Sequence, residues 1–177
     1  MKIVDYIHQG GAIMYILLAL NIFGVALMLY KFFGLNQSKK NIAQTALFIS
    51  SKIKEIFAAD GQHSDSQAKV EITLRELSSY MNTIEKGLNT IKIIATISPL
   101  LGLLGTVLGV LLSFNKMASS GMGDPSVFAS GISLALITTV GGLIVSIPHY
   151  IGHNYLIGMV DDLEQILEKE ILLKVLK

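Results

Sequence analysis

The sequence predicts an all-α membrane protein with three transmembrane helices that continue into long cytoplasmic helical extensions. Three apolar runs, Gly11 to Tyr30, Ile93 to Phe114 and Val127 to Ile147, contain no Asp, Glu, Lys or Arg. Each run is about 20 residues long, and a helix of that length crosses a hydrocarbon layer of roughly 30 Å. The whole chain is 51% hydrophobic and 15% charged, which favours a protein that lies partly in lipid and partly in water.

In chain order we expect seven segments. They are an outer segment at 1–10, a first span at 11–33, a cytoplasmic helical hairpin at 34–92, a second span at 93–114, a short outer loop at 115–125, a third span at 126–150 and a cytoplasmic C-terminal helix at 151–177. The first apolar run is longer than the core of a signal peptide, and no small-residue cleavage pattern follows it. We therefore expect it to be retained as a span.

The basic residues set the expected orientation. Nine of them lie between the first and second apolar runs: Lys31, Lys39, Lys40, Lys52, Lys54, Lys69, Arg75, Lys86 and Lys92. Loops rich in Lys and Arg stay in the cytoplasm. The hairpin and the C-terminal helix should therefore be cytoplasmic, and the N-terminus should lie outside.

The hairpin is predicted from helical periodicity. Apolar residues recur at three-residue and four-residue steps from Ile42 to Ile56, and again from Val70 to Leu88, on either side of a turn at Asp60 to Ser66. Ser64 and Gln67 form a candidate capping box. The second of these helices contains no strong breaker before Pro99, so we expect it to run on into the second span.

Two further signals concern the third span and the tail. Asp124 and Pro125 together resemble a helix start, because Asp accepts hydrogen bonds from the first amides and Pro has no amide hydrogen to leave unsatisfied. The tail has the pattern of an amphipathic helix, and its apolar stripe must pack on the hairpin or on another copy of the chain. That stripe consists of Leu156, Met159, Leu163, Ile166, Leu167 and Ile171.

Small residues form a seam on each of the last two spans. The second span carries Ser98, Gly102, Gly105, Gly109 and Ser113, and the third carries Gly131, Ala135, Thr138, Gly142 and Ser146. Their spacing keeps each set on one face, with Thr106 and Thr139 at the edges. Helices in lipid associate through close backbone approach and hydroxyl hydrogen bonds, so simple packing is the favoured interpretation of these seams.

The two edge threonines leave a second interpretation open. Each hydroxyl can bond the carbonyl one turn back and be merely tolerated, or both can face a cavity and hold water or donate to an ionisable group. A hydroxyl does not titrate near neutral pH, and proton relays in membranes use Asp, Glu or His. A carboxylate would have to come from another chain.

Other classes of function lack support in this sequence. A net charge of +1 and an aromatic fraction of 7% give no basis for nucleic-acid binding. Cysteine is absent, and no Gly-rich phosphate loop, nucleophile elbow or paired carboxylate lies in a plausible cleft, so no enzyme and no cofactor is expected. His149 and His153 are four residues apart but lack a third ligand, so we expect interfacial hydrogen bonds and no metal.

The stretch from Ser98 to Gly109, SPLLGLLGTVLG, and that from Ala135 to Pro148, ALITTVGGLIVSIP, together resemble the MotA/TolQ/ExbB proton channel family. Their order and spacing on adjacent spans make this resemblance specific, and it covers roughly the last half of the chain. Flagellar members have four spans, so the three-span layout favours the ExbB branch or the TolQ branch, with ExbB the nearer.

The resemblance implies a pentameric ring in a bacterial inner membrane, with the N-terminus in the periplasm and the C-terminus in the cytoplasm. Inside the ring it places single-span ExbD-like partners that carry the titrating aspartate. By position it implies that Thr106 and Thr139 are pore-lining threonines. It also implies that the small residues of the two seams pack against the pore and the partner helices. It also implies span prolines at Pro99 and Pro148, and an asparagine at the cytoplasmic pore mouth at Asn154. Relatives often have a glutamate where this chain has Leu134.

The function implied is that of a proton-driven motor subunit that energises a TonB-like protein for import of nutrients such as iron complexes across the outer membrane. Two alternatives stay open. One is a TolQ-like subunit for envelope maintenance. The other is a passive membrane scaffold whose seams only assemble helices.

Overall fold

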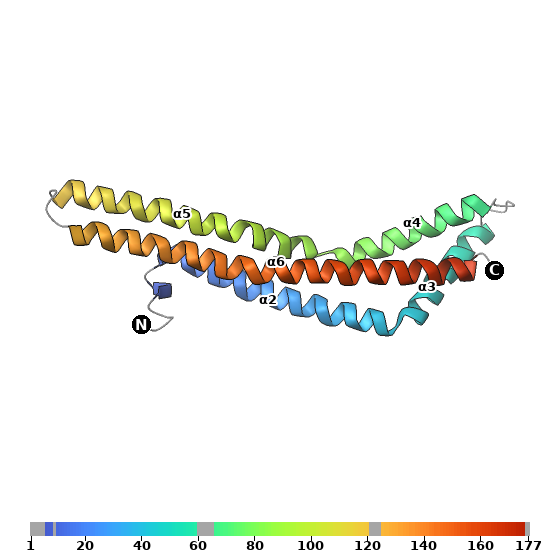
Figure 1. The fold of residues 1–177 in the computed structure, drawn as a ribbon. Coiled ribbons are helices and arrows are strands. Elements are labelled where there is room, and N and C mark those ends of the chain that lie inside the picture. Colours follow the sequence, from blue (N-terminus) through green and yellow to red (C-terminus); the bar gives the residue numbers. More distant parts are fainter. Residues whose placement is uncertain (1–5, 9, 60–65, 121–124, 176–177) are drawn as a thin grey trace. The chain divides into compact units, whose positions relative to one another are not determined.

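The computed structural model describes residues 6–8, 10–59, 66–120 and 125–175, and over these residues the fold is helical without strands (Figure 1). The helices are α2 (Gly11–Lys40), α3 (Ile42–Ala59), α4 (Ser66–Glu85), α5 (Leu88–Ser120) and α6 (Pro125–Val175). The chain divides into two compact units. The first unit contains 1–28 and 90–153, and the second contains 29–89 and 154–177. Helices α2, α5 and α6 contribute to both.

Three helices are long and apolar enough to cross a membrane. They are Gly11–Lys40, Leu88–Ala118 and Gly131–Val175, and an 18-residue stretch within each has a mean hydropathy of 2.4, 2.1 and 1.9, respectively. Large apolar side chains on all three are exposed, among them Ile22 at 64%, Leu100 at 59% and Ile144 at 63%. Such an apolar exterior fits contact with lipid or with other membrane helices. The chain is a multi-pass membrane protein.

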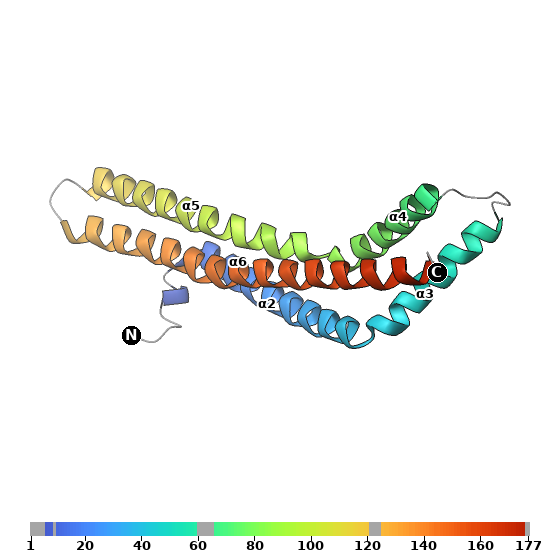
Figure 2. The ribbon, with the colours of Figure 1, turned by 45° about the vertical axis from the view of Figure 1, so that its right-hand side comes forward.

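The first unit has a small apolar core where α2 meets the other two spans. Leu17, Ile94 and Val145 are its buried residues, and Met14 is one of the partly buried side chains around them. A Cβ built on Gly141 would lie 2.6 Å from the sulfur of Met14. Within this unit α5 and α6 run side by side in both views (Figure 2). One edge of the α5–α6 pair is therefore covered by α2.

The second unit is a bundle with a conventional apolar core. The tail stripe is buried as expected at Leu156, Met159, Leu163, Leu167 and Ile171, while Ile166 is 43% exposed. Helix α3 contributes Ala46, Ile49 and Ile53 to the buried residues. Ion pairs join its helices: Lys39 Nζ lies 2.9 Å from Asp162 Oδ2, and Lys52 Nζ lies 2.7 Å from Glu76 Oε2.

The expectation of a continuous helix from the hairpin into the second span is wrong. Helix α4 ends at Glu85 and α5 begins at Leu88, because Gly87 between them adopts a φ of 92°. Glycine reaches this left-handed region without a steric penalty and commonly ends helices. Lys31 Nζ donates a hydrogen bond of 2.9 Å to the carbonyl of Ile84, so a cation from α2 satisfies a carbonyl at the end of α4.

The structure describes only some of the residues on which the other helix-end expectations rest. Ser64 of the candidate capping box and Asp124 of the predicted start lie outside the described residues. Helix α6 begins at Pro125, the position expected for the proline. Pro99 lies inside α5 and Pro148 inside α6, and each helix is one continuous element through its proline. Kinks at these two residues stay a prediction.

Candidate functional site

Helices α5 and α6 approach each other along their small-residue seams. A Cβ built on Gly102 would lie 2.8 Å from the carbonyl oxygen of Thr138. A Cβ built on Gly142 would lie 2.5 Å from the carbonyl oxygen of Ser98. Real Cβ atoms essentially never come that close to a backbone atom, so only glycine fits at these two positions. The backbones of the two helices are in direct contact here.

The same contact continues along the rest of both seams. Gly105 lies against the side chain of Thr138, Gly109 against Ala135, and Gly131 against Ser113. Ser146 Oγ donates to the carbonyl of Ala95 on the facing helix at 2.5 Å. The hydroxyls at Ser98 and Ser113 donate to carbonyls one turn back on α5, at 2.7 and 2.8 Å. The seams thus hold α5 against α6 within one chain, and their contact with a pore or a partner helix stays a prediction.

Thr106 and Thr139 meet at the edge of this seam. Their hydroxyl oxygens are hydrogen-bonded to each other across the two helices. The Gly102 carbonyl lies 3.2 Å from each of the two hydroxyls, and the Ala135 carbonyl lies 3.3 Å from Thr106 Oγ1. Both threonines are half-buried. The structure therefore brings together the two residues that the sequence placed only at the edges of separate stripes.

The chemistry of this threonine pair follows from its donor and acceptor count. Each hydroxyl has one hydrogen to donate and two lone pairs to accept with. If one threonine donates to the other and the second donates to a carbonyl, lone pairs remain for a further donor such as water. Thr138, whose Oγ1 donates to the Ala135 carbonyl at 2.7 Å, is buried behind them. The pair can orient a polar guest but cannot itself exchange a proton near neutral pH.

A surface hollow of about 390 Å³ opens beside the pair on α5. Thr106 is its polar lining residue, and the others are Val107, Val110, Leu111 and Phe114. The remaining edge of the α5–α6 pair, where Gly141 meets Met14, is occupied by α2. The two edges of the α5–α6 pair thus differ. The edge at Gly141 is covered by α2, whereas α5 has a surface hollow at the edge that carries the threonine pair.

His149 departs from the expectation of interfacial hydrogen bonding. Its side chain is fully buried, its Nδ1 donates to the Val145 carbonyl at 2.7 Å, and its Nε2 has no hydrogen-bond partner among the residues that the structure describes. The ring lies against Gly24 of α2, where an added Cβ would overlap it. Among the described residues no cluster of metal-ligating side chains occurs, and His149 serves here as a packing residue between α2 and α6.

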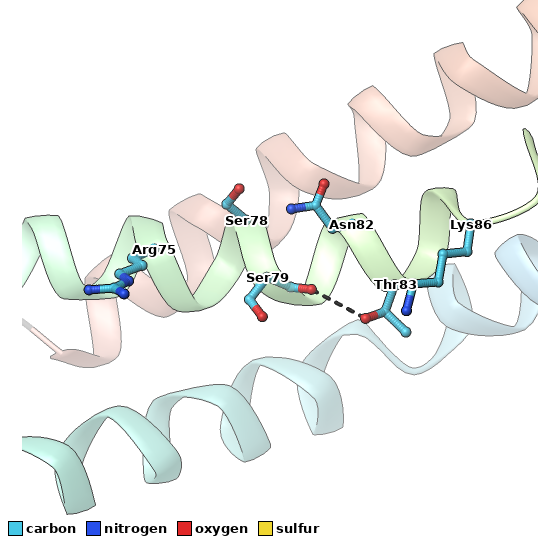
Figure 3. A pocket seen from close by; sticks show the side chains of 6 residues that line it. All are labelled: Arg75, Ser78, Ser79, Asn82, Thr83 and Lys86. Carbon is cyan, nitrogen blue, oxygen red and sulfur yellow. Dashed lines mark hydrogen bonds between the residues drawn. The ribbon is translucent and has the colours of Figure 1, made fainter. Parts of the chain in front are cut away.

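A polar hollow of about 470 Å³ lies on α4 in the second unit (Figure 3). Six residues line it: Arg75, Ser78, Ser79, Asn82, Thr83 and Lys86. All six are exposed; five belong to α4 and Lys86 lies in the turn that follows it, and Thr83 Oγ1 donates to the Ser79 carbonyl at 3.3 Å. Because no residue of another described helix lines this hollow, the six residues form an open polar face and not an enclosed site.

The other predicted residues are placed as follows. Asn154 lies in the second unit, on α6, with an exposed side chain. Leu134 belongs to α6, but its side chain lies outside the described part of the chain. Sequence reasoning missed Gly24, Gly141 and the burial of His149. The only signal for them is the presence of glycine inside an apolar run, which does not identify the contacting helix.

Comparison with known proteins agrees with this architecture. The family model of the MotA/TolQ/ExbB proton channel family matches residues 38–169. An ExbB homologue for biopolymer transport from Methanothermobacter thermautotrophicus is 28% identical over 90% of this chain and 64% of its own length. The biopolymer transport protein exbB1 of Vibrio cholerae is 40% identical over 45% of this chain and 36% of its own length.

A third relative bears a different name. The Tol-Pal system protein TolQ of Haemophilus influenzae is 31% identical over 56% of this chain and 45% of its own length. The chain thus spans between about a third and about two thirds of the length of these relatives. The family match covers both seams and the threonine pair, and its members are transport components and not enzymes. This chain belongs to the MotA/TolQ/ExbB proton channel family.

Proposed function

We propose that this chain is an ExbB-type subunit of a proton-driven motor in a bacterial inner membrane. In this proposal five copies form a ring, with the N-terminus in the periplasm and the C-terminus in the cytoplasm. The spans supply an acid-free lining, and an ExbD-like single-span partner inserts the aspartate that gains and loses the proton. The energy is passed to a TonB-like protein that drives uptake of nutrients such as iron complexes.

The observation that carries the proposal is the hydroxyl contact between Thr106 and Thr139. It lies on a pair of helices whose apolar runs contain no charged residue. Spare lone pairs on these two oxygens can accept from water or from a protonated carboxyl group of a guest helix. A proton crossing a potential of 100 mV releases about 2.3 kcal/mol, and the guest would convert this release into movement.

The seams have a supporting role in this mechanism. By holding the α5 and α6 backbones together, they fix the register that places the two threonines opposite each other. Pro99 and Pro148, each inside a span helix, would shape the cytoplasmic halves of the lining. Asn154, exposed on α6, would lie at the cytoplasmic mouth of the pore. The absence of an acid at Leu134 is consistent with the carboxylate being supplied by the partner.

Proton uptake into vesicles tests the proposal. Vesicles that contain the chain and its single-span partner should take up protons under an imposed potential, and vesicles with the chain alone should not. Thr106→Val together with Thr139→Val should abolish most of the flux while leaving the amount of assembled protein unchanged. The matched control is Thr96→Val, which removes an exposed hydroxyl on α5 that bonds only the Lys92 carbonyl. Flux without a partner, or undiminished flux in the double variant, would refute the mechanism.

Two alternatives predict different results. A TolQ-like role, supported by the likeness to the Haemophilus protein, predicts the same flux but a defect in envelope integrity, and no defect in nutrient uptake, when the chain is deleted. A passive scaffold, supported by the use of the seams within one chain, predicts that the threonine variants are fully functional while Gly105→Leu prevents assembly.

A further inference from the structure

The part of α6 in the second unit exposes two different faces. The first, which we call the acidic face, carries Asp161, Glu164 and Glu168, at steps of three and four residues. The second, which we call the basic face, carries Ile166, Lys169 and Leu173, again at steps of three and four. At about 100° per residue the centres of these faces lie about 140° apart around the helix. Neither face is the buried stripe that packs inside the unit.

The acidic face has unsatisfied charge. Asp161 is exposed, whereas Glu164 and Glu168 are half-buried, and none of the three has an ion-pair partner among the described residues. Three other acids of the same unit are paired: Asp162 with Lys39, Glu76 with Lys52, and Glu170 with Lys174. The further acids Glu55, Glu71 and Glu85 have no ion pair among the described residues but are exposed, unlike Glu164 and Glu168. A nearby cation stabilises a half-buried carboxylate more than an exposed one, because water screens the half-buried charge less.

The basic face has the opposite character and an apolar surface to bury. Ile166 is 43% exposed and Leu173 is 50% exposed, although Leu163, Leu167 and Ile171 of the same helix are buried. Leu173 lines a hollow of about 410 Å³ that also includes Leu47, Ser50 and Lys54 of α3 and Glu170 and Lys174 of α6. Lys54 and Lys169 are exposed and have no ion pair among the described residues.

We propose that copies of this chain join through these two faces, the acidic face of one copy against the basic face and its α3 hollow on the next. The inference rests on the ring of the proposed function and specifies which surfaces close it. Charge complementarity selects a second copy as the occupant, since the described part of one chain displays both three unpaired acids on the acidic face and two unpaired lysines, Lys169 on the basic face and Lys54 in the α3 hollow beside it. A contact between two different faces is heterologous, the type that repeats around a ring.

The experiment uses the full chain, purified in detergent, with its assembly measured by mass photometry over a range of protein concentrations. Glu164→Lys with Glu168→Lys makes both faces basic, and Lys54→Glu with Lys169→Glu makes both faces acidic. Each double variant should raise the concentration at which the assembly dissociates by about tenfold or more, because like charges then meet at every contact. Combining all four substitutions exchanges the faces and should restore assembly.

Mixing the two double variants gives the sharpest result. Each should bind the other in preference to itself, so differently tagged copies should co-purify when mixed but not when either is mixed with its own kind. This readout does not depend on how well either variant assembles alone. Matched controls reverse exposed charges on α4 and in the turn directly after it: Glu71→Lys with Glu85→Lys, and Arg75→Glu with Lys86→Glu, the latter from the polar face of Figure 3.

The outcomes separate this inference from the proposed function. If the unaltered chain is monomeric at all concentrations, the proposed ring is wrong and the inference is wrong with it. If the unaltered chain assembles but the double variants assemble equally well, or only the α4 controls dissociate, the ring stands and these faces are not its contact. Mutual binding of the two double variants, together with restoration in the fourfold variant, establishes the contact.

Discussion

Along α6, the seam residues that face α5 in the first unit are glycine, alanine, serine and threonine, whereas the residues buried in the second unit are leucine, isoleucine, methionine and valine. Both sets hold helices together. The first set does so by backbone contact and hydroxyl hydrogen bonds, such as that from Ser146 to the Ala95 carbonyl. The second set does so by burying large apolar side chains, and ion pairs join its exposed surfaces.

The difference follows from what surrounds each unit. In water, burying apolar area is favourable by roughly 25 cal/mol per Å², so a bundle gains from large side chains. In lipid that gain between helices is largely absent, and close packing and polar contacts must replace it. From the residue types in the contacts of α6 we therefore expect the first unit to lie in the membrane and the second unit to lie in water.

Of the substitutions that test this comparison, Gly142→Leu should lower the free energy of unfolding most. Its Cβ alone would lie 2.5 Å from the Ser98 carbonyl and 3.2 Å from Gly102 Cα, and backbone atoms cannot yield as a flexible side chain can. We expect a loss of more than about 5 kcal/mol in the free energy of unfolding, measured as loss of thermally stable protein in detergent. Gly158→Leu is the matched control on the same helix, because nothing lies within 4 Å of its added Cβ. Equal tolerance of both variants would contradict the packing described for the seam.

Leu167→Ala tests the contrasting region. Leu167 is fully buried in the second unit, so its truncation should lower the free energy of unfolding by about 2–5 kcal/mol through lost burial and the cavity left behind. The control is Leu173→Ala, which truncates a leucine that is 50% exposed on the same helix and should have a much smaller effect in the single chain. Similar losses for the two leucines would show that the second unit is not held by its apolar core.

Most of this contrast can be predicted from the sequence because helical periodicity reports which residues share a face. The seams and the tail stripe have regular spacing, and their contacts appear where that spacing places them. Thr106 and Thr139 could each be assigned to an edge, but their hydroxyl contact depends on the register between two helices. Register is set by the fit of Gly102 and Gly142 against the facing backbone, which spacing along one helix does not encode.

Other features depend on contacts between distant residues. The apolar pattern does not predict the helix break at Gly87, because a glycine inside a helix is only mildly unfavourable. The Ile84 carbonyl at this break accepts a hydrogen bond from Lys31, which is far away in the sequence. His149 resembles an interfacial residue by its place near the end of an apolar run. Its burial depends on Gly24, whose missing side chain makes room for the ring on α2.

Gly24→Ala tests that fit and should have an intermediate effect. The added methyl group would overlap the His149 ring and lie 3.1 Å from Ile94 Cδ1, so we expect a loss of about 1–3 kcal/mol in the free energy of unfolding. In the background of His149→Ala the same substitution should be less harmful, with a coupling of about 0.5–3 kcal/mol in a double-mutant cycle. Gly34→Ala is the control, since no atom lies within 4 Å of its added Cβ. Strictly additive effects would show that Gly24 and His149 do not contact each other.

The smallest effect is expected at the surface of the second unit. Lys52 and Glu76 join α3 to α4 with an N–O distance of 2.7 Å, but their side chains are 56% and 23% exposed. Solvent screens such a pair, so Lys52→Ala and Glu76→Ala should show a coupling of only about 0.2–1 kcal/mol. Thermal unfolding in a double-mutant cycle should find this coupling at low salt and little of it at about 1 M salt, where the Debye length is roughly 3 Å. A coupling that is large and insensitive to salt would mean that this pair is shielded from water, for example by a second copy of the chain. In that case the exterior of the second unit would resemble the first unit in depending on contacts that one chain alone does not complete.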